Sequence, residues 1–264
     1  MCLKWDKPGK FVPLGNGLYL GFELELLHAD GPDDCIAAFQ RPDEEDALIG
    51  SDYLVAVVED GSVCGAEFLS APATLEEHRR RLPELLRFLT GPSGFRAPES
   101  GSIDLEETGF HVHVSREVLG KAHPQQALET LVTLLIYGGP AWQDYQLKLA
   151  GRSGTDWAAR RTGSQFRPWE DVFFSQRQQF SPLWIHEARH QKELRLNLQH
   201  GKTLEFRQAA SSNNPDTLLR WMTFCEAICQ FSRVYEGRDD VVDAAELQVF
   251  LDWAREHGYT LPPR

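Results

Sequence analysis

Apolar and polar side chains alternate in four short parts of the chain, with the period of two that is typical of a half-buried β-strand. These parts are GLYLGFELELL at 17–27, VCGAEFLSAP at 63–72, GFHVHVS at 109–115 and the pair ELRLNL and TLEFR within 193–209. A turn at His200 and Gly201 predicts that this last pair forms a hairpin. A further segment, YLVAVVED at 53–60, is apolar almost throughout and also predicts a strand.

Longer segments with helical periodicity lie between and after these strands. Thr74, followed three positions later by Glu77, predicts a helix that begins with a capping box, and Pro83 should kink or split that helix. Asp243 and Glu246 show the same capping pattern before a last helix that reaches about residue 257. Further helices are expected at 123–139, 140–150 and 214–235.

Strands early and late in the sequence, with helices between them, favour the α+β class, with a mainly antiparallel sheet. The chain has 264 residues, of which 42% are hydrophobic and 25% are charged, which is the composition of an ordinary globular protein. No Gly/Ser-rich linker divides it. We therefore expect one domain over residues 1–264.

The charge and the cysteines limit the partners and the compartment. A formal net charge of −12 disfavours nucleic acid and anionic membranes, so an anionic substrate would need local positive charge from metal ions or arginines. No apolar run is long enough to span a bilayer, and MCLKWDKPGK lacks the apolar centre of a signal peptide. Five cysteines without a CxxC motif predict a reduced, cytoplasmic protein, in which Cys225 and Cys229 pack on one helix face.

Ionisable side chains share one face in each of the four alternating strands, because residues two apart point to the same side of a strand. If the strands form one sheet, its apolar face packs on helices and its other face collects a group of charged and imidazole side chains. The members of this group are Glu23, Glu25, Glu67, His111, His113, Glu205 and Arg207.

Electrostatics limits what such a face can be. Four carboxylates within about 6–8 Å of one another would repel by about 2 kcal/mol per pair at an effective dielectric constant near 20. The six pairs together would cost about 12 kcal/mol, which is comparable with the whole stability of a domain. The arrangement therefore predicts bound cations. Carboxylate oxygens with one or two imidazoles match Mg²⁺ or Mn²⁺.

Each strand taken alone also has a simpler interpretation. Glu23 and Glu25 are the pattern of a strand face in water, and an HVH segment can be a surface pair or a zinc pair. Glu205 and Arg207 alone would be a same-face ion pair worth less than about 1 kcal/mol. The four segments together, in this order, favour a common site.

The chain resembles the amidoligases, which are ATP-dependent carboxylate–amine ligases related to glutamine synthetase and to glutamate–cysteine ligase. The resemblance depends on four ordered segments that span residues 21–209: GFELE, EDGSVCGAEFLSAP, TGFHVHVS and LRLNLQHGKTLEFRQA. It implies a single catalytic domain like that of glutamine synthetase. In that fold a curved, mainly antiparallel sheet holds the active site on its concave side, and helices cover the outer face.

The resemblance also implies roles for the ionisable group. Glu23 and Glu25 would bind two different Mg²⁺ ions, with Glu67 beside Glu25 on one ion. The other ion would be shared by Glu23, His111 and Glu205. A third carboxylate for the Glu25 ion has no clear match, and Asp52, Asp60 or water could take its place.

The nucleotide and the transferring phosphoryl group would be bound by further residues in this resemblance. His113 would reach the phosphates of ATP, and Arg207 would stabilise the phosphoryl group in transfer. Arg195 and Asn197 are candidates for substrate or phosphate contacts. The arginine-rich segment 151–182 is either a cover over the phosphates or a solvated surface loop.

The predicted activity is the ATP- and Mg²⁺-dependent formation of an amide or peptide-like bond through an acyl phosphate. The partners would be small-molecule or peptide carboxylates and amines, whose identity the sequence leaves open, as it does the oligomeric state. Two alternatives remain open here. One is a metal-dependent hydrolase that uses the histidines and glutamates with an activated water, and the other is a non-catalytic binding protein on the same fold.

Overall fold

The structure is a computed structural model, and it describes residues 4–6, 13–28, 53–59, 65–91, 93–98, 108–137, 140–152, 196–198, 200–234 and 246–264. The chain divides into two compact units. The first consists of Met1–His113 with Ala210–Leu219, and the second of Val114–Ala209 with Arg220–Arg264. The expectation of one domain over 1–264 stays a prediction.

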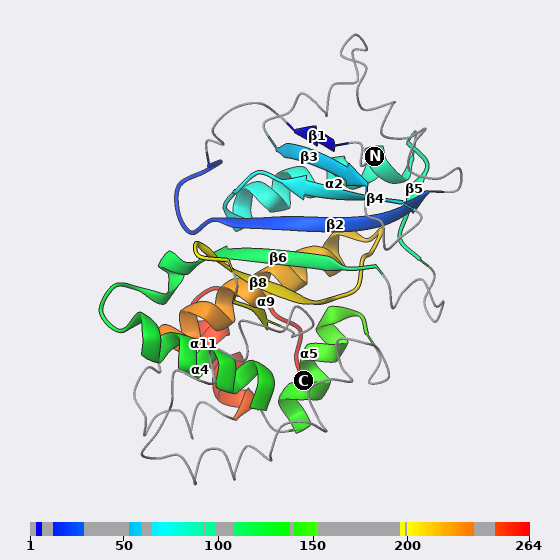
Figure 1. Cartoon of the computed structure of the whole chain (residues 1–264). Helices are drawn as coiled ribbons and strands as arrows, with labels where there is room; N and C mark the ends of the chain where they lie inside the picture. Colours follow the sequence, from blue (N-terminus) through cyan, green and yellow to red (C-terminus); the bar gives the residue numbers. More distant parts are fainter. Residues whose placement is uncertain are drawn as a thin grey trace. The chain divides into compact units, whose positions relative to one another are not determined.

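The first unit is built on a mainly antiparallel sheet with the strand order β1-β3-β4-β2-β6 (Figure 1). Its strands are β1 (Lys4–Asp6), β3 (Leu54–Glu59), β4 (Gly65–Ser70), β2 (Leu20–His28) and β6 (Phe110–Ser115), and β6 continues into the second unit. A short strand, β5 (Phe95–Arg96), pairs with the end of β2. The printed sequence pattern therefore predicted β2, β3, β4 and β6 at nearly their observed positions.

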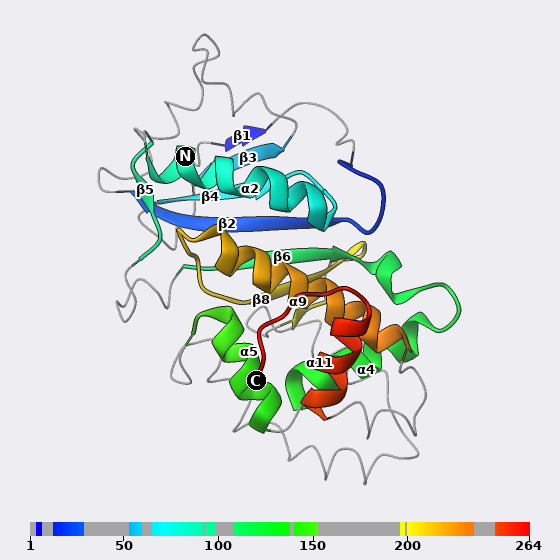
Figure 2. The same ribbon diagram turned by 180° about the vertical axis from the view of Figure 1, so that it is seen from behind.

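One face of this sheet is apolar and is covered by helix α2 (Leu75–Thr90), which lies across it (Figure 2). Phe22 and Leu24 on β2 and Phe68 on β4 are almost completely buried. The ring of Phe22 lies 5.7 Å from that of His78 on α2, which identifies this face as the one that the helix covers. The helix contributes its own buried stripe of leucines at 75, 82, 85, 86 and 89.

Helix α2 begins as predicted but differs from the prediction in its capping box. The backbone N–H of Glu77 donates to Oγ1 of Thr74, whereas the Glu77 carboxylate binds Arg80 and Arg81, so only half of the capping box forms. Of the two alternatives at Pro83, a kink or a split, the split does not occur, because the helix runs through Pro83 without interruption. The proline removes one N–H group, and the buried leucine stripe on both sides of it keeps the helix in place.

A buried polar bridge joins α2 to the sheet. Nε2 of His78 lies 3.0 Å from the carbonyl oxygen of Leu20, and its Nδ1 lies 2.7 Å from the hydroxyl of Tyr53. Because a carbonyl oxygen only accepts, Nε2 carries the proton and Nδ1 accepts from Tyr53. Burial lowers the pKa of His78 to about 4, so the ring is neutral at pH 7.

Among the described residues, the second unit combines a hairpin with helices that pack beside it. The hairpin strands are β7 (Leu196–Asn197) and β8 (Thr203–Ala209), which pair antiparallel as predicted. A 3-10 turn, η2 (Arg116–Leu119), follows β6, and the helices are α4 (Pro124–Tyr137), α5 (Pro140–Ala150), α9 (Pro215–Val234) and α11 (Leu247–Glu256). Helix α9 begins in the first unit and continues into the second.

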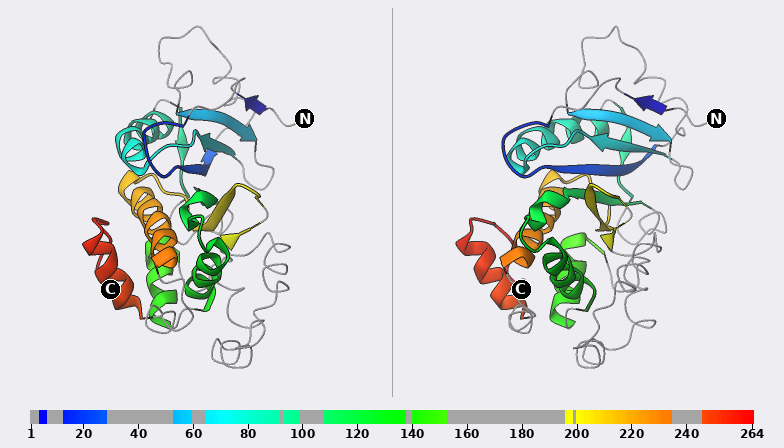
Figure 3. Two further views of the ribbon diagram at one scale, coloured as in Figure 1. Left: turned by 90° about the vertical axis from the view of Figure 1, so that its left-hand side faces the viewer. Right: turned by 60° about the vertical axis from the view of Figure 1, so that its left-hand side comes forward.

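Aromatic side chains hold the helices of the second unit together. Helices α9 and α11, orange and red in Figure 3, lie side by side, with the ring of Phe231 5.3 Å from each of Phe250 and Trp253. Trp142 on α5 lies 5.2 Å from Phe250 in the same cluster. Cys225 and Cys229 are fully buried on α9, which confirms the packing role that their spacing predicted.

The beginning of α11 corrects another expectation. The residue before the helix is Glu246, and its side chain makes no capping hydrogen bond. The part that the prediction gave to Glu246 in the capping box is therefore wrong. Asp243 lies outside the described residues. The helix begins at Leu247 because a buried stripe that includes Phe250, Leu251 and Ala254 begins there.

The coarse fold class is confirmed as a mixed fold of helices and a mainly antiparallel open sheet. Over the part of the chain that the structure describes, none of the helices is long and apolar enough to cross a membrane.

Candidate metal centre

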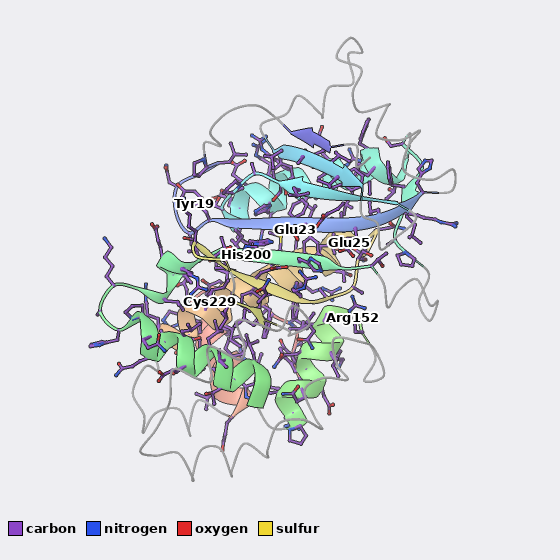
Figure 4. The ribbon with its side chains drawn as sticks, viewed as in Figure 1. Tyr19, Glu23, Glu25, Arg152, His200 and Cys229 are labelled. Atoms are coloured by element: carbon purple, nitrogen blue, oxygen red, sulfur yellow. The ribbon has the colours of Figure 1, made fainter. Side chains whose placement is uncertain are left out.

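Strand β2 places Glu23 and Glu25 on the sheet face opposite to the apolar one (Figure 4). The neighbouring Leu24 and Leu26 are fully buried on the other side, so the pleat of the strand fixes the direction of both carboxylates. Glu25 itself is only 7% exposed. A carboxylate so far removed from water needs hydrogen bonds or cations to remain charged.

Glu25, Glu67 and His111 form the ligand set of a candidate metal centre in the first unit. Glu67 on β4 is the direct cross-strand partner of Glu25. His111 on β6 is 6% exposed, and its Nε2 lies 3.8 Å from Oε1 of Glu25. One ligand atom from each of the three residues lies within 4.8 Å of the other two. Three strands that are distant in sequence thus bring these ligands together.

Gly109, two residues before His111, anchors the Glu25 carboxylate. Its backbone N–H donates to Oε2 of Glu25, and its carbonyl accepts from the backbone N–H of Glu25 at 3.0 Å. A Cβ atom at this position would lie 2.6 Å from Nε2 of His111 and 3.4 Å from Oε2 of Glu25. Only glycine therefore leaves the space between these two ligand atoms open.

Glu23 binds two imidazole rings, one with each carboxylate oxygen. Nδ1 of His111 lies 3.2 Å from Oε2, and Nε2 of His113 lies 2.9 Å from Oε1. Burial raises the pKa of the Glu23 carboxyl, but the hydrogen bonds and charges of His111 and His113 outweigh it and hold that pKa well below its usual range. Glu23 is therefore ionised and acts as an acceptor for both rings.

The residues of the first unit fit a divalent cation. The set offers two carboxylates and one imidazole, which is a donor set that Mg²⁺ or Mn²⁺ accepts. If a cation binds here, Glu25, Glu67 and His111 are the side chains that hold it.

A second ionisable cluster lies on the hairpin of the second unit, around Glu205. Glu205 is 1% exposed, and its carboxylate accepts from Nδ2 of Asn197 at 2.6 Å. Nε2 of His200 lies 2.9 Å from the same oxygen, and Nη1 of Arg207 donates to the other one. Nε of Arg207 is buried and has no hydrogen-bond partner among the described residues.

The guanidinium group of Arg116 in η2 holds this hairpin at its turn. Its Nε donates to the carbonyl oxygens of His200 and Thr203 at 3.0 and 3.2 Å, and its Nη2 donates to that of Leu198 at 2.8 Å. The backbone N–H of Arg116 donates to the carbonyl of Lys202. Arg116 thereby fixes the strand ends that carry the Glu205 cluster.

The structure brings together most of the predicted site residues within their own units. Glu23, Glu25, Glu67, His111 and His113 cluster in the first unit, and Asn197, Glu205 and Arg207 cluster in the second. That Glu205 shares a cation with Glu23 and His111 stays a prediction. Arg195, Asp52, Asp60 and residues 153–182 lie outside the described residues.

Sequence reasoning did not single out Gly109, His200 or Arg116. The glycine is part of the TGFHVHVS segment, but its role depends on a contact across the sheet that spacing does not show. The sequence predicts His200 only as a turn residue, although its place between Asn197 and Glu205 is a signal that could indicate its contact with Glu205.

Comparison with models of known protein families gives no match for the chain. Comparison with curated proteins also gives no match. Function is therefore argued from the residues and their geometry.

Proposed function

We propose that this protein is an ATP- and Mg²⁺-dependent carboxylate–amine ligase of the amidoligase type. The observation that carries the proposal is the grouping of Glu25, Glu67 and His111, which come from three separate segments of the amidoligase-like pattern. In this proposal the open sheet is the curved sheet of a catalytic domain like that of glutamine synthetase. Its polar face is the active face, and α2 belongs to the outer layer.

The proposed reaction requires activation of a carboxylate. A carboxylate does not react with an amine at neutral pH, so ATP first transfers its γ-phosphoryl group to a carboxylate oxygen, with release of ADP. The amine then attacks the acyl carbon, and phosphate leaves. Divalent cations, when bound, neutralise the negative charge of the phosphates in such transfers.

The side chains of the first unit have a defined part in this proposal. Glu25 and Glu67 hold the cation in place, and the Gly109 N–H keeps the Glu25 carboxylate in one orientation. Glu23 keeps the His111 and His113 rings fixed. Preorganised ligands of this kind stabilise developing charge without further rearrangement.

Arg207 is the proposed partner of the transferring phosphoryl group. Its Nη1 is held by Glu205, which is in turn fixed by Asn197, so the guanidinium is oriented before a substrate arrives. The side chain of Arg207 is 27% exposed, so it is not closed off from solvent. A positioned arginine stabilises the charge on phosphoryl oxygens in transfer. That both clusters take part in one reaction stays a prediction.

The proposal is tested by a coupled assay. The protein is incubated with ATP, Mg²⁺ and hydroxylamine against a panel of carboxylates, and both phosphate release and hydroxamate are measured. A ligase gives both products, and both depend on the carboxylate. A metal-dependent hydrolase needs no ATP, and a binding protein gives neither product, so either result would refute the ligase.

Glu205→Ala is the decisive variant for the hairpin cluster. We expect it to abolish carboxylate-dependent turnover of ATP while the far-ultraviolet circular dichroism spectrum stays unchanged. Glu256→Ala, the same substitution at an exposed position at the end of α11, is the matched control and should retain full activity. An active Glu205→Ala enzyme would remove Glu205 from the catalytic group.

A further inference from the structure

Arg152, labelled in Figure 4, follows helix α5 and binds the end of strand β8 within the second unit. Its Nε donates to the carbonyl oxygen of Gln208 at 2.8 Å, and its Nη2 donates to that of Ala209 at 3.3 Å. Successive carbonyls of a regular strand point to opposite sides, so one guanidinium group reaches both only where the strand ends. Arg152 therefore fixes the point at which β8 stops.

The end of α5 directs Arg152 toward that strand. Gly151 has a φ of +67°, a left-handed conformation that glycine adopts without strain. Its N–H donates to the carbonyl of Lys148 at 3.4 Å, and the N–H of Arg152 donates to that of Leu147 at 3.0 Å. These two bonds form the Schellman motif, which commonly ends a helix. The motif turns the chain at Gly151 and fixes the backbone of Arg152.

The two elements that Arg152 joins are both firmly packed. On the helix side, the hydroxyl of Tyr145 donates to the carbonyl of Pro262 at 2.8 Å, and Trp142 is buried beside Phe250. On the strand side, the side chain of Gln208 is buried. The guanidinium therefore connects two fixed parts of the second unit, and the position of α5 is passed to the end of β8.

Arg207 is the residue whose position depends on this clamp. It immediately precedes Gln208, so its backbone lies beside the first clamped carbonyl. The other end of the Arg207 side chain is held by Glu205 through Nη1. The bond to Glu205 alone would fix only the tip of a long side chain with several rotatable bonds. With Arg152 on the strand, both the backbone and the guanidinium group of Arg207 are fixed.

We propose that Arg152 is a positioning residue of the ligase reaction, which aligns Arg207 with the transferring phosphoryl group by clamping the end of β8. The inference rests on the proposed function, because that proposal gives Arg207 its task. Arg152 acts through the strand and has no assigned contact with the substrate. Two carbonyls at different positions require the planar fork of a guanidinium group, which the single ammonium group of lysine does not provide.

Arg152→Lys tests the clamp, because it keeps the charge and removes the fork. Hydroxamate formation by the full chain is measured with the carboxylate of the panel that gives the highest rate, at a temperature at which circular dichroism shows each variant folded. We expect kcat to fall by up to about 100-fold, as for a misplaced catalytic group, with the KM for ATP nearly unchanged. Arg255→Lys, the same change at an exposed position on α11, should retain the wild-type kcat. A residue that only stabilises the fold would leave kcat unchanged in folded protein, and that result would overturn the proposal.

Two substitutions of Gly151 test the same device from the helix side. Apart from its chain neighbours, no atom of the described residues lies within 4 Å of a Cβ built at Gly151, so only the positive φ restricts this position. Asparagine tolerates the left-handed conformation, whereas a β-branched residue does not. Gly151→Asn should therefore keep the wild-type kcat, and Gly151→Val should lower it as Arg152→Lys does. Equal rates in the two variants would contradict the role of the turn.

Hydrogen exchange and the wild-type assay separate this inference from the proposed function. Arg152→Lys should speed the exchange of backbone amides at the end of β8, whereas Arg255→Lys should not, and equal exchange would show that Arg152 does not hold the strand. A wild-type protein that forms no hydroxamate with any carboxylate refutes the ligase and the catalytic task of the clamp. An active wild type with an unchanged kcat in Arg152→Lys refutes the positioning role alone.

Discussion

Glu67→Gln should change stability in opposite directions with and without a cation. Glu25 and Glu67 are direct partners across β2 and β4, and their ligand atoms lie within 4.8 Å. In the absence of a cation the two charges repel each other, so removal of one charge should stabilise the fold. In the presence of a cation the same substitution removes a ligand and should reduce the stabilisation that binding provides.

The size of each effect follows from the geometry. Two unit charges at 4.8 Å repel by about 3 kcal/mol at an effective dielectric constant near 20. Like charges directly opposite each other in a sheet are measured to destabilise by about 0.2–1 kcal/mol. We therefore expect about 1 kcal/mol, which raises the Tm of a chain of this size by about 2–4 °C.

Cation binding should have a larger effect on the wild type. A cation at 100 times its dissociation constant stabilises the folded state by about 2.7 kcal/mol. This energy corresponds to a rise in Tm of about 5–10 °C, most of which Glu67→Gln should lose.

The assay is thermal unfolding at neutral pH, followed by circular dichroism, with EDTA and with Mn²⁺. Glu84→Gln is the control, because Glu84 is exposed on α2 and the substitution is chemically identical. The control should shift neither curve. A Glu67→Gln variant that melts below the wild type in EDTA would refute the repulsion argument. A variant that retains the full Mn²⁺ shift would remove Glu67 from the ligand set.

Three further predictions follow from buried or clamped groups. Burial lowers the pKa of His78 to about 4, so on acidification the unfolded state takes up a proton near pH 6.5, before the folded state does, and the free energy of unfolding should fall by up to about 3 kcal/mol between about pH 6.5 and 4. Denaturant titrations at several pH values measure this fall. His78→Leu should flatten the pH dependence, and an unchanged slope in that variant would contradict the assignment. Burial raises the pKa of Cys225 and Cys229, so a thiol reagent should modify them only after denaturation, and fast labelling of the native protein would contradict their burial. Arg116→Ala should speed hydrogen exchange of the backbone amides in β8, whereas Lys148→Ala on α5 should not, and equal exchange in both variants would show that the clamp does not stabilise the hairpin.

The alternating pattern predicted the strands of the first unit and the face on which each ionisable side chain lies. Apolar residues at every second position, such as Phe22, Leu24 and Leu26, all point to the same face of a sheet and are buried in the structure. A shift of the strand register by one residue would turn all of them to the polar face. For this reason Glu23 and Glu25 could be placed on the polar face from sequence alone.

The partners of those side chains could not be predicted in the same way. Which residue lies opposite Glu25 depends on strand order and register, and these follow from packing across the whole sheet. Register makes Glu67 the direct neighbour of Glu25 and places Gly109 against its carboxylate. The Glu246 prediction failed for a related reason, because burial of a helix face outweighed the local capping signal at the beginning of α11.

The candidate metal centre joins one glutamate to one glycine through both backbone and side chain. The N–H of Glu25 donates to the carbonyl of Gly109, and the N–H of Gly109 donates to the carboxylate of Glu25. The strand pairing that aligns the backbone therefore also fixes the ligand oxygen. Two adjacent ionised carboxylates would otherwise be pushed apart or take up protons. Because the sheet holds Glu25 and Glu67 side by side, any repulsion between the two ionised carboxylates should favour binding of a cation between them. In a site of this kind, the repulsion that favours cation binding also lowers the stability of the cation-free fold. Glu67→Gln should therefore raise the stability of the cation-free protein and lower its affinity for the cation.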